Sequence, residues 1–401
     1  MQGSTVVKIM LAMAVVLFIS ALALMVYRSE GATLNWQTGE NDPVQGIYPD
    51  GTDLYVVTAS NVSLVDDTGK LLWTVPFNGT QYSAIGNNGQ LYVYSAGLGL
   101  NAISPAGNLS LVARQSMNRP PIVGPDGTLY LRSWTILSAI SPSGATDWNM
   151  TNVISDPVVD GLGNTYFFVR PPENISDVYL DCIGPDGNTR WAIEYQDYYA
   201  STSLMTADSG VLVYDETMGT LDHIDEYGNT TWDHSMTYLG QYNLVQDNEN
   251  RLYMFFLWGT ALVLDENGNP ISKFNPIITY DANLSYQPVA YNDTIYLAGD
   301  GKYPDSMMLY SLNVDGTLKW KQQLNGSTAP SIYAAGGIEC FATEVSDDGR
   351  LMPVLYIISD TGNVMYTYRP DDASPWRQIY IAGDDTVYAL TSDGQLYALK
   401  G

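Results

Sequence analysis

The side chains that most often perform chemistry are scarce, with two histidines and two cysteines among 401 residues. His223 and His234 both lie in the stretch "LDHIDEYGNTTWDH", and no third ligand or nucleophile motif accompanies them. Cys182 and Cys340 are far apart and lack metal-ligand spacing, so we interpret them as unpaired residues on buried strands. These four residues predict neither a metal centre nor a catalytic triad.

The acidic residues form no recognisable catalytic group, because most of them lie in short turns such as "DDTG", "DENG" and "SDDG". Asp and Asn favour turn conformations, so an acidic turn beside glycine is typical of a solvated hairpin. "DENGNP" also departs from the EF-hand calcium loop. Carboxylates paired for glycoside hydrolysis need only to meet across a channel, and that alternative stays open. We therefore assign no catalytic, cofactor-binding or metal-binding residue and expect no cofactor.

The charge balance is strongly acidic, since 17 Lys and Arg face 43 Asp and Glu for a net charge of −26. Such a surface repels polyanions, and no basic cluster offsets it, so the sequence argues against a nucleic-acid partner. The bases are scarce and the acids form no long runs. We interpret this composition as a soluble, acidic, extracytoplasmic surface.

Residues 9–27, "IMLAMAVVLFISALALMVY", are nineteen residues without a charge. This length spans a bilayer as a helix, whereas a secretory signal peptide has a shorter apolar region. We expect a retained signal anchor here, after a tail at residues 1–8 and before a linker at 28–32 and a folded domain at 33–401. The alternative is a cleaved signal peptide. The domain would then be extracytoplasmic and either anchored in the membrane or secreted.

The rest of the chain repeats one sequence motif. In "GPDGTLYLRSWTILSAISPSGATDW", a turn at Gly124 leads to Tyr130 on one strand, Ile140 on the next and Trp148 after a second turn. Nine phased units of this kind follow one another at spacings of about 36 to 48 residues. Each alternates apolar and polar residues and is punctuated by Asp-Gly, Asn-Gly or Ser-Gly turns. A period near 40 with several short strands predicts an all-β fold, a β-propeller.

The two ends of the domain predict a closed ring. The last unit stops at Gly401, before the Trp-bearing strand that finishes other units, and "TLNWQTG" near the N-terminus supplies a spare strand with Trp36. Pairing this strand with the C-terminal strands would complete the last blade and remove two exposed sheet edges.

The repeated phrase resembles the repeat of the pyrroloquinoline-quinone (PQQ)-like β-propeller family, D-G-x-[LV]-Y … [LY]-A-[LIV]-x-x-x-G-x-x-x-W, over residues 33–401. The resemblance implies a propeller of typically eight blades, whereas nine units are counted, so eight or nine blades are expected. Quinoprotein dehydrogenases of this family hold the quinone with a Trp on one face and a disulfide between adjacent cysteines on the other. This chain has no adjacent Cys pair, and we expect a member that binds no quinone.

Sequons for N-glycosylation are frequent after the apolar segment, and they predict a surface glycoprotein. Their asparagines are Asn61, Asn78, Asn108, Asn149, Asn174, Asn229, Asn283, Asn292 and Asn325.

Three units carry insertions where the opening phrase has only the short hairpin at residues 132–135. The insertions surround Asn174, Tyr303 and Asp348, and equivalent connections of a propeller emerge on one face, so we predict a binding face there. The many tyrosines at the repeated Leu-Tyr position are interpreted as packing residues. Tyr198, Tyr199 and Tyr303 lie outside it and are the better candidates for contacts with glycans.

These observations predict a non-catalytic propeller that acts as an interaction or assembly scaffold at the cell surface or envelope. Its partner would be a protein or a glycan, and the N-terminal helix would hold it at the membrane. The alternative is an enzyme with a site at the mouth of the channel, either a quinoprotein dehydrogenase or a carbohydrate-active enzyme.

Overall fold

The computed structural model describes residues 33–38, 42–174, 177–195, 202–207, 209–215, 219–235, 242–256, 260–276, 287–301, 306–326, 331–335, 338–347, 350–370 and 374–400. The expected signal anchor at 9–27 lies outside these residues, as do Tyr198, Tyr199, Asn283, Tyr303 and Asp348. Within the described ranges, no helix has the length and apolar character needed to cross a bilayer.

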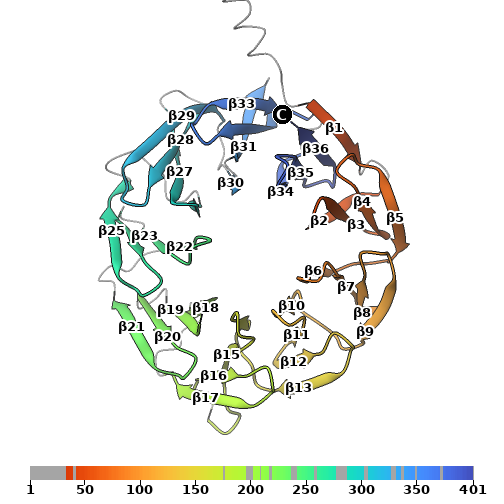
Figure 1. The fold of residues 1–401 in the computed structure, drawn as a ribbon, viewed down its shortest axis with the longest axis vertical. Coiled ribbons are helices and arrows are strands. Elements are labelled where there is room, and N and C mark those ends of the chain that lie inside the picture. Colours follow the sequence, from red (N-terminus) through yellow and green to blue (C-terminus); the bar gives the residue numbers. More distant parts are fainter. Residues whose placement is uncertain are drawn as a thin grey trace, which may run out of the picture.

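The 36 regular elements of the described residues are all strands, and they form nine four-stranded sheets. The sheets follow one another around a ring as the blades of a propeller (Figure 1). One sheet corresponds to each of the nine repeat units. We number the blades in chain order, so that blade 1 begins with β2.

The strands of blades 1, 2 and 3 are β2 (Val44–Asp50), β3 (Asp53–Thr58), β4 (Asn61–Val65), β5 (Leu71–Pro76); β6 (Tyr82–Ile85), β7 (Leu91–Ser95), β8 (Gly99–Ile103), β9 (Leu109–Ala113); and β10 (Ile122–Val123), β11 (Leu129–Ser133), β12 (Ile136–Ile140), β13 (Thr146–Met150). Those of blades 4, 5 and 6 are β14 (Val158–Val159), β15 (Thr165–Val169), β16 (Tyr179–Ile183), β17 (Thr189–Glu194); β18 (Thr202–Thr206), β19 (Val211–Asp215), β20 (Thr220–Ile224), β21 (Thr230–Ser235); and β22 (Tyr242–Gln246), β23 (Leu252–Phe256), β24 (Ala261–Leu264), β25 (Pro270–Phe274). Those of blades 7, 8 and 9 are β26 (Val289–Tyr291), β27 (Thr294–Asp300), β28 (Ser306–Asn313), β29 (Leu318–Asn325); β30 (Ser331–Ala335), β31 (Ile338–Asp347), β32 (Arg350–Ser359), β33 (Val364–Tyr368); and β34 (Trp376–Ile381), β35 (Val387–Thr391), β36 (Leu396–Lys400) and β1 (Thr33–Thr38).

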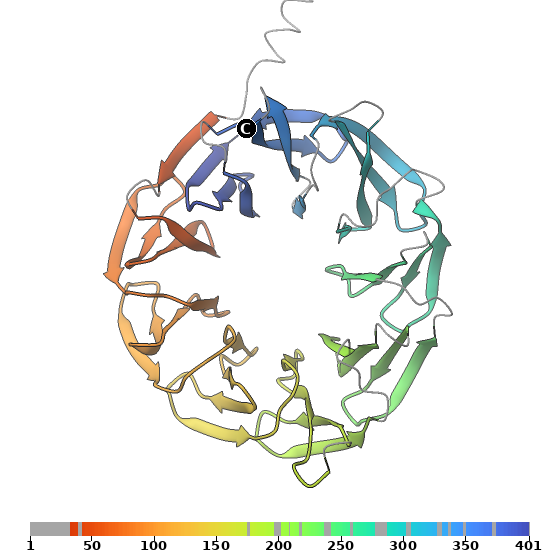
Figure 2. The same ribbon diagram turned by 180° about the vertical axis from the view of Figure 1, so that it is seen from behind.

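Each blade runs from its first strand on the inside of the ring to its fourth strand at the rim (Figure 1). Because neighbouring strands are antiparallel, the connections alternate between the two faces of the ring, which Figures 1 and 2 show in turn. The turns between strands 1 and 2 and between strands 3 and 4 lie on one face, here called the turn face. The hairpin between strands 2 and 3 and the connection to the next blade lie on the other, the crossover face.

The ring closes through blade 9, in which strands from both ends of the chain share one sheet. β1 pairs antiparallel with β36, with Thr33 opposite Lys400 and Thr38 opposite Leu396. The N-terminal strand therefore forms the outer strand of a blade whose other three strands come from the C-terminus. This pairing covers the edge that β36 would otherwise expose.

The hydrophobic core is divided among the junctions between blades. Nine clusters of buried side chains each join two neighbouring blades, and together they include all nine junctions of the ring. Tyr55 of blade 1, for example, packs with Leu91 and Val93 of blade 2. A second strand such as β7 is buried along its whole length because it has a neighbouring blade on each side. The Leu-Tyr dipeptide of the repeat is therefore a packing feature.

The repeated Trp of blades 1, 4 and 7 docks its blade onto the next one. The Trp73 indole N–H donates to the carbonyl oxygen of Pro105 in blade 2 at 2.9 Å, and its ring lies 5.8 Å from that of Tyr55. The turn glycine Gly107 faces this ring with a φ of 79°, and a Cβ atom there would lie 2.9 Å from the indole. Glycine is required at this point for both its left-handed backbone and its lack of a side chain.

Candidate functional site

The two cysteines lie in blades 4 and 8, and both histidines lie in blade 5. Cys182 is buried on β16 as a free thiol, and burial raises its pKa to about 12, so the unreactive thiol is the stable form. Cys340 lies on β31, but its side chain is outside the described residues. His223 and His234 both contact the ring of Trp232 in blade 5. Among the side chains that the structure describes, no three His, Cys, Asp or Glu residues form a metal-binding group.

The asparagines of the sequons are mostly accessible. Asn78, Asn108, Asn149, Asn174, Asn229, Asn292 and Asn325 are exposed. Asn61 is half-buried, and its side-chain nitrogen donates to Ser60 Oγ at 2.7 Å, so it is the poorest acceptor of this set. Asn283 lies outside the described ranges.

The three insertions all belong to the hairpin between strands 2 and 3, which lies on the crossover face. Exposed Asn174 lies between β15 and β16 of blade 4. In blades 7 and 8, part of the added sequence extends the strands themselves. β28 has 8 residues and β31 and β32 have 10 each, against 5 in β11 and β12. Tyr303 and Asp348 lie outside the described residues.

The short hairpin of blade 3 carries the most exposed tryptophan of the described residues. The side chain of Trp134 is 74% exposed, and its backbone φ of 54° is in the left-handed region that non-glycine residues rarely adopt. Two hydrogen bonds hold this conformation. The Trp134 N–H donates to Asn118 Oδ1 at 2.9 Å, and Arg132 Nε donates to the Trp134 carbonyl oxygen at 3.1 Å. The structure therefore fixes an apolar ring in solvent.

A groove of about 220 Å³ lies next to this hairpin on the crossover face, lined by residues 119–122, Tyr130, Arg132 and residues 156–157. Asp156 pairs with two arginines there, at 3.3 Å from Arg119 Nε and in a close contact with Arg132. The charges sum to one net positive charge in a protein whose total is −26. We call these residues together with Trp134 the Trp134 groove.

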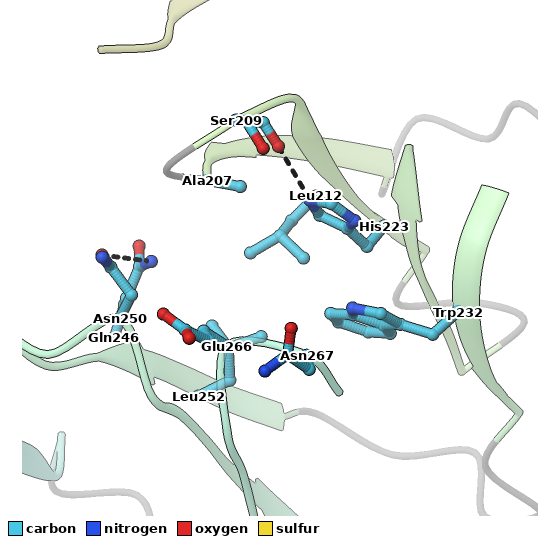
Figure 3. A pocket seen from close by; sticks show the side chains of 10 residues that line it. All are labelled: Ala207, Ser209, Leu212, His223, Trp232, Gln246, Asn250, Leu252, Glu266 and Asn267. Atoms are coloured by element: carbon cyan, nitrogen blue, oxygen red, sulfur yellow. Dashed lines mark hydrogen bonds between the residues drawn. The ribbon is translucent and has the colours of Figure 1, made fainter. Parts of the chain in front are cut away.

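A second cavity, of about 190 Å³, opens on the turn face between blades 5 and 6 (Figure 3). Its floor is apolar, because Leu212 and Leu252 are each only 2% exposed. Its rim is polar and comes from three turns and three strands: Ser209, His223, Trp232, Gln246, Asn250, Glu266 and Asn267. We call this cavity the Trp232 pocket.

His223 forms a fixed wall of the Trp232 pocket. Its ring stacks on Trp232 with centroids 5.5 Å apart and planes 14° apart. Nε2 donates to the Ser209 carbonyl oxygen at 3.0 Å, because a carbonyl can only accept, and Nδ1 lies 2.5 Å from the hydroxyl oxygen of Thr231. Both ring nitrogens therefore have hydrogen-bond partners, and the ring packs against Trp232.

The indole N–H of Trp232 has no hydrogen-bond partner among the described residues. In blades 1, 4 and 7 the equivalent tryptophans donate to the next turn, over 2.9 Å from Trp73 to Pro105, 3.0 Å from Trp191 to Glu226 and 2.7 Å from Trp320 to Asp360. In blade 5 the equivalent turn residue is Glu266, and His234 Nε2 donates to the carbonyl oxygen of Gly268 in the same turn at 2.8 Å. Figure 3 shows the nitrogen-bearing edge of Trp232 turned toward the space between Glu266, Asn267 and Leu212.

Comparisons with known proteins identify the fold and nothing narrower. No protein-family model and no curated protein sequence matches the chain. A crystal structure of a eukaryotic initiation factor matches 84% of this chain and 90% of its own, with a TM-score of 0.66 and 12% sequence identity. At this identity the likeness establishes the shared propeller architecture alone.

Two further solved structures align over most of the chain with lower scores. BamB from Moraxella catarrhalis covers 92% of this chain and 97% of its own at 14% identity, with a TM-score of 0.48. A streptogramin B lyase covers 91% and 97% at 12% identity, with a TM-score of 0.39. The functional assignment therefore has to come from the chain's own surface.

Proposed function

We propose that this protein is a non-catalytic, extracytoplasmic β-propeller of the PQQ-like type, held at the membrane by residues 9–27, that binds a protein partner through the Trp134 groove. The observation that carries the proposal is the fixed exposure of Trp134. A tryptophan with a left-handed backbone conformation is strained, and its ring is exposed to solvent. Such features persist where they contribute to binding.

The composition of the groove fits a protein partner better than a small ligand. Trp and Arg are among the residues that dominate binding energy at protein interfaces, and the exposed side chains of Trp134 and Arg119 lie beside this groove. The local positive charge on an otherwise acidic protein favours an acidic segment of the partner. Arg119 is 54% exposed along its side chain and is available for such a contact.

The absence of catalysis is part of the same proposal. His223 has both ring nitrogens engaged, and burial raises the pKa of the Cys182 thiol to about 12, which keeps it protonated. Neither side chain is available as a base or nucleophile. The propeller would then act as an interaction scaffold of the envelope.

The test compares two equally exposed aromatic residues on opposite faces of the ring. Trp134 and Tyr227 are each 74% exposed, and Tyr227 lies in a turn of blade 5 on the turn face. We expect Trp134→Ala to weaken binding of the partner recovered by crosslinking on intact cells by about 30-fold, the effect of losing about 2 kcal/mol at a hot spot. Tyr227→Ala should bind like the wild type.

Three results would contradict this proposal. Equal capture of the partner by wild type and Trp134→Ala would exclude the groove as its contact. Equal losses in both variants would place the contact elsewhere or indicate misfolding. Binding of the isolated protein to a glycan array that depends on Trp134 would replace the protein partner with a glycan.

A further inference from the structure

The Trp232 pocket differs from the equivalent junction of blades 4 and 5 in its free donor. That junction also has a hollow, of about 450 Å³, but there Trp191 donates its indole N–H to the Glu226 carbonyl oxygen at 3.0 Å. In the Trp232 pocket the equivalent N–H faces the cavity without a protein acceptor among the described residues. A half-buried donor left without a protein acceptor is a position that a ligand can satisfy.

The free donor alone does not define a site. The indole N–H of Trp148 in blade 3 also has no acceptor among the described residues, and no ligand need be inferred there. In blade 5 the donor coincides with a cavity of about 190 Å³, an apolar floor and further polar groups that converge on the same space. Ligand sites typically combine these features: apolar walls with a few placed polar groups.

The volume limits the size of the ligand. A cavity of about 150 Å³ accommodates a benzene ring, so about 190 Å³ accommodates one six-membered ring with small substituents. A longer molecule would have to extend from the rim into solvent over the turns of blades 5 and 6.

The lining groups limit the chemistry of the ligand. No Lys or Arg lines the pocket, and Glu266 contributes a negative charge, so a phosphate or carboxylate ligand would be repelled. An amine would satisfy Glu266 but has no acceptor for the Trp232 N–H. Hydroxyl groups both donate and accept, so a ring bearing several hydroxyls satisfies the indole donor and the carboxylate acceptor together.

We propose that the Trp232 pocket is a binding site for a single neutral sugar ring, such as the terminal hexose of a glycan. The apolar face of the sugar lies against Leu212 and Leu252, a hydroxyl accepts from Trp232 Nε1, and another donates to Glu266. In Figure 3 Glu266 and Trp232 lie on opposite sides of the space, as two groups that hold one ring between them must. His223, stacked on Trp232, keeps the indole in place. This site lies on the turn face and does not depend on the Trp134 groove.

The experiment uses the full-length protein in detergent and methyl glycosides of glucose, galactose, mannose and N-acetylglucosamine as probes. Binding is followed by ligand-observed NMR saturation transfer and by calorimetry. We expect one of the glycosides to bind with a Kd of about 1 mM, a typical free energy of about −4 kcal/mol for one small ring. Trp232→Phe keeps an aromatic ring but removes the N–H, and it should weaken binding about tenfold.

The matched control is Trp191→Phe, the same change at the junction where the donor already has a protein acceptor. It should leave the Kd unchanged, and Glu266→Gln should weaken binding while retaining the size of the side chain. Saturation transfer to none of the four glycosides would overturn the proposal, as would an equal loss in both Trp→Phe variants. Because Trp134→Ala should not affect glycoside binding, failure of this proposal is distinguishable from failure of the protein-partner proposal.

Discussion

Trp73 and Trp232 occupy the same position of their repeats, and the structure uses them differently. Trp73 donates its indole N–H to blade 2 at 2.9 Å and packs edge-on against Tyr55, so its polar and apolar parts both serve the junction. Trp232 packs against His223 and His234, and its N–H faces a cavity. Tryptophan at one position of the repeat therefore joins two blades in the case of Trp73 and lines a pocket in the case of Trp232.

The difference arises from the neighbours of Trp232 rather than from the tryptophan. His234 on β21 donates to the Gly268 carbonyl oxygen at 2.8 Å and contacts the indole, and the ring of His223 stacks on the indole. Both histidines of the protein therefore lie beside one ring. In a repeat protein, a function can arise by changing the residues around a conserved scaffold position while the scaffold position itself is kept.

The largest expected effect is on the free energy of unfolding. The loss should be larger at Trp73, between blades 1 and 2, than at Trp232, between blades 5 and 6. Trp73→Ala removes a packed ring and a hydrogen bond between blades, so we expect the free energy of unfolding to fall by about 3 kcal/mol. Trp232→Ala should lower it by roughly 1 kcal/mol less, because one edge of that ring already faces a cavity. Urea denaturation followed by far-UV circular dichroism measures both. A larger loss at Trp232 would contradict the comparison.

The blade itself was predictable from the sequence because its determinants are local. Alternating strands such as "LYLRS" and "ILSAI", with Gly at the turns, specify a small sheet wherever they occur, and nine repetitions specify the ring. The pairing of β1 with β36 follows from a missing outer strand at one end and a spare one at the other. These conclusions need only the pattern of one repeat and the position of the chain ends.

The candidate sites could be predicted only in part, because they depend on contacts between blades. The turn "DENG" at Glu266 closely resembles "DEYG" at Glu226, yet only the second accepts an indole N–H. Orientation of a ring against a turn about 35 residues away has no local pattern. One feature of the sequence could have indicated this junction. Both histidines belong to the repeat of blade 5, and in the structure both contact Trp232.

The binding face was predicted from the three insertions. Trp134, the contact residue that we propose, lies on a hairpin without an insertion. Residues 132–135 were identified as the short alternative to the three insertions. The structure shows that this hairpin exposes Trp134 through a left-handed backbone, which sequence patterns do not anticipate for tryptophan. Part of the added sequence in blades 7 and 8 extends strands instead of forming loops.

The second prediction isolates the indole N–H. Trp73→Phe keeps an aromatic ring but removes the donor to Pro105, so it should lower the free energy of unfolding by about 1 kcal/mol more than Trp232→Phe does. At Trp232 the lost donor has no protein acceptor among the described residues, and only the change in ring size remains. Equal losses in the two variants, measured by urea denaturation without added glycoside, would mean that the Trp232 N–H is satisfied within the protein.

The smallest effect tests the same principle at another repeated position, occupied by Asp181 in blade 4 and Asp222 in blade 5. Both lie on faces turned toward the preceding blade, and burial raises the pKa of each. Asp222 is hydrogen-bonded by Tyr195, whereas the buried Oδ1 of Asp181 has no hydrogen-bond partner among the described residues. The pKa of Asp181 rises to about 6.

A folded-state pKa above the unfolded value means that the neutral carboxyl is favoured by folding. Its contribution is therefore complete below about pH 4 and is lost as the pH rises through about 6. We expect the free energy of unfolding of the wild type to fall over this pH range. For Asp181→Asn it should fall by about 0.5 to 1 kcal/mol less than for the wild type. The difference is small because the carboxyl is only partly buried. Urea midpoints measured from pH 4 to pH 8 test this. Parallel pH profiles for the wild type and Asp181→Asn would show that Asp181 ionises in the folded protein without penalty, and that its unpartnered oxygen, unlike the free donor of Trp232, is solvated.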